Sequence, residues 1–219
     1  EIEPFRVVEV LARATALAAS GADIVHMAAG EPDFPTAAPI IEAGRAALAR
    51  GATHYSQAAG IPALREALSQ YYADTYGLDI APSRILITPG ASGALLLIAA
   101  LLMNPGDGML MTDPGYPCNR HFMRLVEGRG QLVRVDARSN YQLNAELVAA
   151  HWQYNTMGAM VASPATPPAQ RCRGSSWQRW QRRCARATVT CWWMRFTTDW
   201  FTTVRRPPCW RSIRKRSLS

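Results

Sequence analysis

The sequence predicts an α/β fold built around a mostly parallel β-sheet. Short apolar runs alternate with longer amphipathic segments over residues 2–165, and turns rich in Gly and Pro join them. Such alternation favours a parallel sheet with helices on both faces, and folds of this kind bind ligands at the carboxyl ends of their strands. The 219 residues are 48% hydrophobic, so the chain can bury a sizeable core.

The strands are predicted from short apolar runs bounded by turn residues, the pattern of strands buried on both faces. The predicted strands are Asp23–Met27, Ile85–Thr88, Gly108–Thr112, Gln131–Val135 and Gly158–Ala162.

The helices are predicted from apolar faces with a 3.6-residue period, rich in Ala and Leu. Pro62 suits a first helical turn, where its missing N–H is not needed. The predicted helices are Val8–Ala19, Ile40–Arg50, Pro62–Tyr76, Gly93–Leu102 and Leu143–Trp152.

Composition divides the chain into two unlike segments near Ala165. Of the 24 basic and 16 acidic residues, 13 basic residues and only Asp199 lie from Ala165 to Ser219, which leaves 11 basic and 15 acidic residues in the body. Six of the seven Trp and four of the five Cys also lie in the tail. The cysteines form no CxxC pair, so neither a metal site nor a disulfide framework is predicted. This shift is too abrupt for one evolved domain.

Targeting signals are not evident in the sequence. No apolar run reaches eighteen residues, and the first residues do not resemble a signal peptide. We therefore expect a soluble, cytoplasmic protein that does not engage a membrane. The first residue is Glu1 rather than Met, so we expect the amino end to be incomplete.

The turn at residues 89–94 carries the first chemical signal. The sequence Pro-Gly-Ala-Ser-Gly-Ala follows a predicted strand and opens a predicted helix. Unpaired N–H groups and the helix dipole at such a position stabilise an anion such as a phosphate. Taken alone, a Gly-rich turn of this kind is more often purely structural. Its spacing matches neither GxGxxG nor GxxxxGK[ST], which disfavours ordinary dinucleotide and P-loop sites.

Together, the turn motifs of residues 2–165 resemble class I aminotransferases, which depend on pyridoxal phosphate and have fold type I. The resemblance lies in the order and spacing of several motifs. These are GEPDFP at residues 30–35, YS at 55–56, GIPALR at 60–65, TPGASGAL at 88–95, NPGD at 104–107, DPGYP at 113–117 and ASPA at 162–165.

This resemblance implies a truncated three-layer α/β/α large domain, with the N-terminal segment of the small domain. It also implies site residues. Gly30 would approach the substrate carboxylate through its backbone, and Ala91 and Ser92 would hold the cofactor phosphate. Tyr116 would stack on the pyridine ring, and Tyr55 would reach the phosphate of a neighbouring subunit in a homodimer. Without the resemblance, a structural turn at Gly30 and packing roles for both tyrosines are the alternative interpretations.

The family pattern breaks at Thr166. The family continues with Asn-Pro-Thr-Gly-Thr, whereas residues 166–170 here read Thr-Pro-Pro-Ala-Gln. If codons for the family sequence are read from the second base of the first codon, they encode Thr-Pro-Pro-Ala and then Gln or His. We therefore expect that a single base is missing near the Ala165 codon, and that residues 166–219 are an out-of-frame tail rather than a native domain.

Residues 191–200 provide an independent check of this interpretation. The bases that encode these residues can be regrouped so that the last base of each codon is read with the first two bases of the next. The new codons must encode Leu-Val-Asp first, can encode Glu-Ile-Tyr-His-Gly next, and must encode Leu at the end. The family has a strand ending in Asp-Glu-x-Tyr at about this distance, and its Asp pairs with the pyridinium nitrogen. The hidden strand supports the frameshift interpretation.

The catalytic lysine is the decisive residue for activity. Transamination in this family needs a lysine that binds the cofactor covalently and carries the proton. The only lysine is Lys215, in a basic run without a cofactor motif. The sequence therefore predicts no catalytic residue here. The parent enzyme would transfer an amino group between an amino acid and a 2-oxo acid, and this chain would be inactive. The alternative is a non-enzymatic protein that binds nucleic acid or other anions through its Arg/Trp-rich tail.

Overall fold

A computed structural model describes residues 4–28, 30 and 34–162, together with the backbone of residues 190–195 and 201–204. The chain divides into two units, the first comprising Pro4–Gly90 and the second containing the residues from Ala91 onwards.

The first unit is helical. Its elements are α1 (Arg6–Ala19), α2 (Ala38–Ala49), α3 (Pro62–Tyr76) and the short 3-10 helix η1 (Pro82–Arg84). Helix α3 has the predicted bounds: Pro62 occupies its first position, and Gly77, which follows it, has a left-handed φ of 63°. Helices α1 and α2 also form where they were predicted, and neither buries a single residue.

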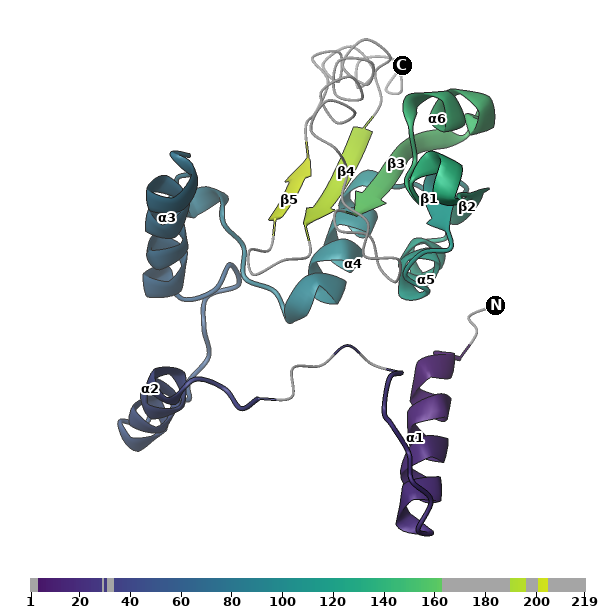
Figure 1. Cartoon of the computed structure of the whole chain (residues 1–219). Helices are drawn as coiled ribbons and strands as arrows, with labels where there is room; N and C mark the ends of the chain where they lie inside the picture. The colour runs from purple at the N-terminus through teal and green to yellow at the C-terminus, as the bar shows by residue number, and fades with distance from the viewer. Residues whose placement is uncertain (1–3, 29, 31–33, 163–189, 196–200, 205–219) are drawn as a thin grey trace. The chain divides into compact units, whose positions relative to one another are not determined.

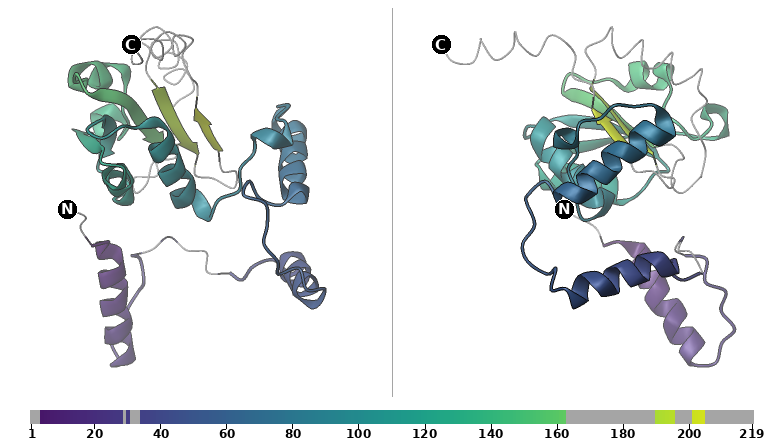
Figure 2. Two further views of the ribbon diagram at one scale, coloured as in Figure 1. Left: turned by 180° about the vertical axis from the view of Figure 1, so that it is seen from behind. Right: turned by 90° about the vertical axis from the view of Figure 1, so that its left-hand side faces the viewer.

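The second unit contains a five-stranded sheet (Figures 1 and 2). The strands are β1 (Gly108–Asp113), β2 (Arg129–Arg134), β3 (Thr156–Ala162), β4 (Thr190–Arg195) and β5 (Phe201–Val204). Their order is β2-β1-β3-β4-β5, and every neighbouring pair is parallel except β4 and β5. This confirms the predicted mostly parallel sheet.

Helices cover both faces of this sheet and make the predicted three layers. Helices α4 (Gly90–Leu102) and α5 (Cys118–Leu125) pack on one face, and α6 (Ala145–His151) packs on the other. The burial of β1 alternates accordingly: Met109 and Met111 belong to the core cluster with α4 and α5, and Leu110 belongs to the cluster with α6. A 3-10 helix, η2 (Ala137–Ser139), lies between β2 and α6.

Two predicted strands were wrong. Residues 23–27 and 85–88 form no strand, although Ile85 has extended backbone angles. A strand needs a hydrogen-bonded neighbour, and Ile87 bonds through its N–H only to Ala59 of a turn. Among the described residues, neither segment has a ladder partner.

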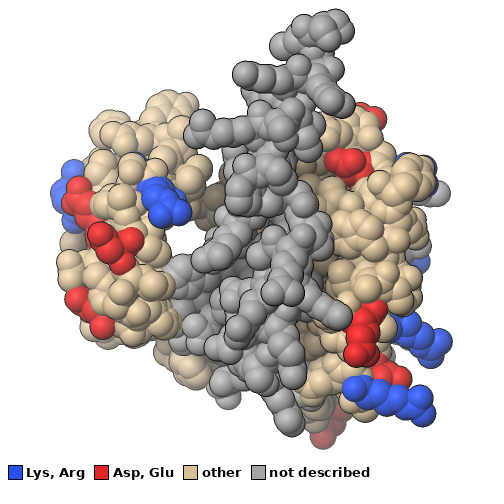
Figure 3. Space-filling model, turned by 90° about the horizontal axis from the view of Figure 1, so that it is seen from above, with Lys and Arg blue, Asp and Glu red and all other residues tan. Residues whose placement is uncertain are grey.

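Charges in the described part are mixed rather than gathered by sign. On the face shown in Figure 3, acidic and basic side chains of the described residues alternate across the surface. Arg6–Glu9 and Arg45–Glu42 are exposed ion pairs within single helices. Exposed ion pairs of this kind contribute little to stability.

Candidate functional site

The carboxyl ends of β1 and β3 define an edge of the sheet, and three of the predicted site residues, Ala91, Ser92 and Tyr116, belong to the segments beside it. These strands are parallel neighbours and end at Asp113 and Ala162. Helix α4 leads into β1 and packs on the sheet, so its first turn lies towards this edge (Figure 1). In open parallel sheets the carboxyl edge is the usual place for a ligand.

The turn at residues 113–117 shapes one side of the site. A Cβ added to Gly115 would lie 2.5 Å from the carbonyl oxygen of Thr112, so this position accepts only glycine without rearrangement. The turn leads directly into α5, because the N–H of Asn119 donates a hydrogen bond of 3.2 Å to the Tyr116 carbonyl. Tyr116 is therefore held between the end of β1 and the start of α5, with its side chain half-buried.

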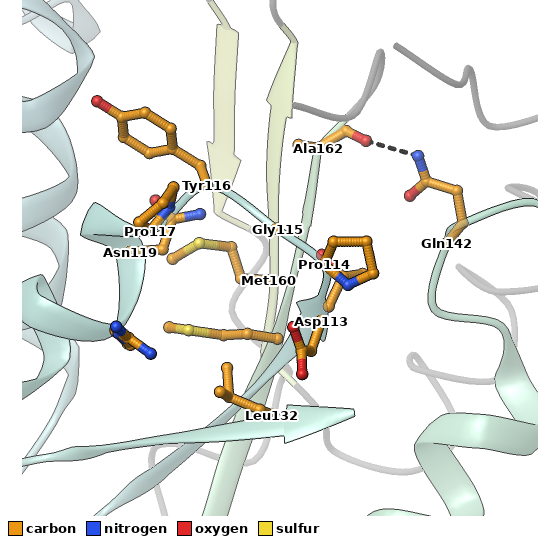
Figure 4. A pocket seen from close by; sticks show the side chains of 13 residues that line it. Asp113, Pro114, Gly115, Tyr116, Pro117, Asn119, Leu132, Gln142, Met160 and Ala162 are labelled. Carbon is orange, nitrogen blue, oxygen red and sulfur yellow. Dashed lines mark hydrogen bonds between the residues drawn. The ribbon is translucent and has the colours of Figure 1, made fainter. Parts of the chain in front are cut away.

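A cavity of about 220 Å³ opens beside this turn (Figure 4). Its floor is apolar, with Met111 and Met160 from β1 and β3 and Leu132 from β2. The amide of Gln142 lines it as well and donates a hydrogen bond of 3.0 Å to the Ala162 carbonyl. Asn119 contributes a side-chain oxygen that is buried without a hydrogen-bond partner in the described part of the chain. The cavity therefore combines an apolar floor with two amide side chains.

Tyr116 lines the rim of the cavity, and Figure 4 shows its ring directed away from Pro114 and Gln142. A hydrogen bond with the Cys118 side chain raises the pKa of the phenol, and desolvation and the nearby Cys118 charge raise it further. Tyr116 therefore remains neutral near neutral pH.

Ala91 and Ser92 occupy the first turn of α4, which begins at Gly90 rather than at the predicted Gly93. Ala91 packs against the cluster that contains Met111 and Met160, and Ser92 is exposed. The first turn contains no acidic residue, and Gly90 precedes both residues with a left-handed φ of 70°. The first N–H groups of a helix lack helical acceptors, so this turn presents donors without a competing carboxylate.

Gly30 and Tyr55 lie in the first unit. A Cβ on Gly30 would meet nothing within 4 Å in the described structure, so no crowding there requires glycine. Tyr55 is fully exposed between α2 and α3. The predicted roles of both residues stay predictions.

Two residues on which the expected loss of activity depends lie outside the described part of the chain. Thr166 and Lys215 belong to segments that the structure does not describe. Backbone pairing makes Thr190–Arg195 a parallel neighbour of β3, and this segment overlaps the residues that were expected to hide the family strand in another reading frame.

Neither α5 nor the polar groups around the cavity were predicted from the sequence. Helix α5 is short and carries Arg120, His121 and Arg124, so it lacked the Ala/Leu pattern used to find the other helices. Asn119 and Gln142 belong to no recognised motif, and only the folded chain brings them to the same cavity.

Within the described ranges, no group of three or more His, Cys, Asp or Glu side chains is placed to hold a metal ion. The same residues include no helix long and apolar enough to cross a membrane.

The sequence profile described as "Aminotransferase class I and II" matches residues 22–173. The chain belongs to this aminotransferase family. The match ends within the tail, a few residues beyond the predicted break at Thr166. The family assignment agrees with the motif order in the sequence and with the parallel sheet of the second unit.

Individual aminotransferases show how much of the fold is present. The (5-formylfuran-3-yl)methyl phosphate transaminase of Methanocaldococcus jannaschii is 40% identical over 124 residues, which cover 57% of this chain and 34% of that enzyme. The aspartate aminotransferase of Thermotoga maritima is 31% identical over 167 residues, which cover 76% of this chain and 44% of that enzyme. The chain thus spans less than half the length of these two relatives.

Solved structures of aminotransferases also match this chain over about half of their own length. An aminotransferase from Mycobacterium tuberculosis has a TM-score of 0.82 at 29% identity, covering 87% of this chain and 49% of that one. The aspartate aminotransferase of Thermus thermophilus with maleate also has a TM-score of 0.82 at 29% identity, covering 89% of this chain and 51% of that one. The fold is therefore that of a fold type I aminotransferase, present over about half its length.

Proposed function

We propose that this chain is the N-terminal portion of a pyridoxal-phosphate-dependent aminotransferase, whose parent enzyme transfers an amino group between an amino acid and a 2-oxo acid. One observation carries the proposal: the first turn of α4 and the cavity beside Tyr116 share Met111 and Met160 at the carboxyl edge of the sheet. This proximity supports a site in which the N–H groups of that turn would bind the phosphate and the ring of Tyr116 would meet the pyridine ring.

The residues present fit one part of the cofactor. The N–H groups of Ala91 and Ser92 and the Ser92 hydroxyl would hold the phosphate, since the first turn of α4 has donors and no carboxylate. The neutral ring of Tyr116 would stack on the pyridine ring. When bound, pyridoxal phosphate serves as an electron sink for the carbon that carries the amino group. Gly30 would leave room for the substrate carboxylate.

The residues for the chemical step do not fit. The single lysine, Lys215, lies in a run of basic residues, and Thr166 stands where the family has Asn. Without a lysine at the cofactor, no group of this chain is assigned to the proton transfer. We therefore propose that the chain does not catalyse transamination.

The parent enzyme is proposed to be a cytoplasmic homodimer in which Tyr55 crosses to the neighbouring subunit. The full exposure of Tyr55 supports this role, because no contact within the described residues occupies its ring. Substrates and assembly both belong to the whole enzyme, of which this chain spans about half.

The tail is proposed to result from a lost base near the Ala165 codon. Restoring one base should open a continuous frame that encodes Asp-Glu-Ile-Tyr-His, then a Ser-x-x-Lys type motif and a second domain. Resequencing the gene tests this proposal. Stop codons throughout the restored frame, with no lysine motif, would contradict it.

A basic binding protein is the second candidate function. Thirteen basic residues and six Trp in the tail support it, since Arg and Trp bind phosphates and bases. An intact frame through the Ala165 codon in the source DNA would favour this candidate over the frameshift.

Cofactor binding tests the main proposal. Equilibrium dialysis should show weak, reversible binding of pyridoxal phosphate, and Ser92→Asp should abolish it because a carboxylate in the first turn repels the phosphate. Ser83→Asp, at an exposed position of η1, is the control that should leave binding unchanged. Borohydride should leave no adduct after gel filtration, and no amino acid and 2-oxo acid pair should show transfer above background. A stoichiometric adduct at Lys215 with turnover would refute the proposal.

A further inference from the structure

The sheet separates at its carboxyl edge between β1 and β3. The last paired residues of these neighbours are Leu110 of β1 and Ala159 of β3. Both strands continue beyond this pair, to Asp113 and Ala162, and on their other sides they stay paired to these ends with β2 and β4. Along the chain, β1 is followed by β2 on one side of the gap and β3 by β4 on the other. Parallel sheets bind ligands where strand connections diverge in this way.

Gln142 reaches this gap from the segment between β2 and α6. Only 5% of the residue is exposed. Its side-chain amide donates a hydrogen bond of 3.0 Å to the carbonyl of Ala162, drawn as a dashed line in Figure 4, and both residues line the cavity. A buried amide needs such a partner, because burial without a hydrogen bond costs free energy. The bond thus joins the connecting segment to the last residue of β3, where pairing with β1 has already stopped.

The backbone before Gln142 has an unusual conformation. Asn140 and Tyr141 have left-handed φ values of 55° and 51°, which are uncommon for residues other than Gly and most of all for a bulky one. Such residues persist only where the surrounding structure fixes them. The Tyr141 N–H donates a hydrogen bond of 2.8 Å to the Asp136 carbonyl, and beyond Gln142 the side chain of Asn144 caps α6. The segment is therefore held on both sides of Gln142.

We propose that Gln142 is a positioning residue, whose side-chain amide fixes the end of β3 at the wall of the cavity where the ladder with β1 has ended. Without this bond, the end of β3 would have to be ordered when a ligand enters the cavity, and that ordering weakens binding. The inference rests on the proposed function only where it concerns the cofactor. The contact between Gln142 and Ala162 concerns this chain alone.

Selective isotope labelling tests the contact without any cofactor. Ala is followed by Ser only at residues 19–20, 91–92 and 162–163, so carbonyl carbon-13 Ala with nitrogen-15 Ser gives three amide–carbonyl correlations. The Ala162 carbonyl signal should move upfield in Gln142→Met, because hydrogen bonding deshields a carbonyl carbon and the Met side chain has no donor. The other two correlations should stay in place. An unchanged Ala162 signal would overturn the proposal.

Gln142→Glu separates the hydrogen bond from the shape of the side chain. A protonated carboxyl donates to the Ala162 carbonyl, whereas a carboxylate only accepts. Burial and this bond both favour the protonated form, so the pKa of the introduced carboxyl should lie above its ordinary value of about 4.3. The Ala162 signal should lie near that of the unsubstituted chain below this pKa and move upfield as the pH rises through it. Asp113, Tyr116 and Arg120 also line the cavity, so the unsubstituted chain is measured over the same pH range to correct for their charges. A signal that shows no further dependence on pH would overturn the proposal.

Binding of pyridoxamine phosphate, measured by equilibrium dialysis, tests the positioning role. Gln142→Met should weaken the affinity roughly 2- to 10-fold, the range expected for one hydrogen bond. Gln142→Glu should lose at least as much above the pKa of its carboxyl and recover most of the loss below it. The reference at each pH is Gln153→Glu, which makes the same change at an exposed position outside the cavity.

Unchanged affinity in Gln142→Met would overturn the positioning role. So would a loss of affinity while the Ala162 signal stays in place, because Gln142 would then act in another way. Failure of the unsubstituted chain to bind pyridoxamine phosphate would count against the proposed function, and the Ala162 signal would still decide whether Gln142 fixes the end of β3.

Discussion

At the scale of single residues, Gly115 is the position with the least freedom in the candidate site. The Thr112 carbonyl oxygen and hydroxyl would lie 2.5 and 2.8 Å from an added Cβ. The nearest of these atoms is a backbone oxygen, so the turn itself must move to admit a methyl group. The turn carries Tyr116, and a shift there would displace the ring from the place where it is proposed to meet the cofactor.

Gly115→Ala should therefore destabilise the second unit by about 1–3 kcal/mol, the usual cost of overpacking. The free energy of opening of the β1 amides, from hydrogen exchange, measures this change. Gly44→Ala is the matched control, since the same methyl group meets nothing within 4 Å in α2. Equal effects of the two substitutions would contradict the expected crowding at Gly115.

Sequence identified some residues of the site but not all of them. Ala91, Ser92 and Tyr116 belong to motifs of fixed order, and the structure brings them to one edge of the sheet. Asn119 belongs to no motif, because it stands out only through the burial of its side-chain oxygen. Features of that kind depend on the local path of the chain and have no signature in the sequence.

At the scale of elements, a polar network joins β2 to β3 across the intervening strand. The side chain of Gln131 lies over Gly108 of β1, where an added Cβ would collide with its amide. Its carbonyl accepts a hydrogen bond of 2.6 Å from the Thr156 hydroxyl, and its amide donates to Asn155 at 3.1 Å. Gly108 thus allows two strands that are not neighbours to share side-chain hydrogen bonds at the amino edge of the sheet.

Gln131→Ala should destabilise the second unit by about 1–3 kcal/mol, because the hydroxyl of the buried Thr156 loses the acceptor of its hydrogen bond. Gln153→Ala is the matched control. Gln153 is exposed, and its side chain accepts one exposed hydrogen bond from the side-chain amide of Gln131. The expected loss of stability is therefore under about 0.5 kcal/mol. Urea unfolding followed by the exchange of the β1 and β3 amides measures both. The network has no structural importance if Gln131→Ala behaves like the control.

Periodicity and end signals explain which elements were predictable. Pro62 and Gly77 mark the ends of α3, so its bounds followed from local chemistry. The segments 23–27 and 85–88 have the composition of strands, but a strand also needs a neighbour distant in sequence. Composition cannot supply that neighbour, and none of the described residues does so.

At the scale of the whole molecule, the two units differ in how much they bury. The second unit has fully buried side chains on both faces of its sheet, including Met109, Leu110, Met123 and Val133. In the helices of the first unit, Tyr72 of α3 is the one buried residue. Helix α4 is also poorly buried on one side, since the side chains of Leu97 and Leu101 remain 57% and 70% exposed. A chain that spans half of its relatives has the elements of the fold without all the surfaces that cover them.

Amide hydrogen exchange should separate the two units of this chain. Helices α1 and α2 have 14 and 12 residues and bury none of them, and isolated helices of such length are marginal in water. Their amides should exchange almost as fast as those of free peptides, while β1 and β3 should be protected because their faces are buried by α4, α5 and α6. Deletion of Pro4–Ala49 should leave the protection of β1 unchanged, because none of the residues that bury its faces lies in that segment. Equal, cooperative protection of α1, α2 and β1, lost together on this deletion, would show that the amino-terminal helices contribute to the same core.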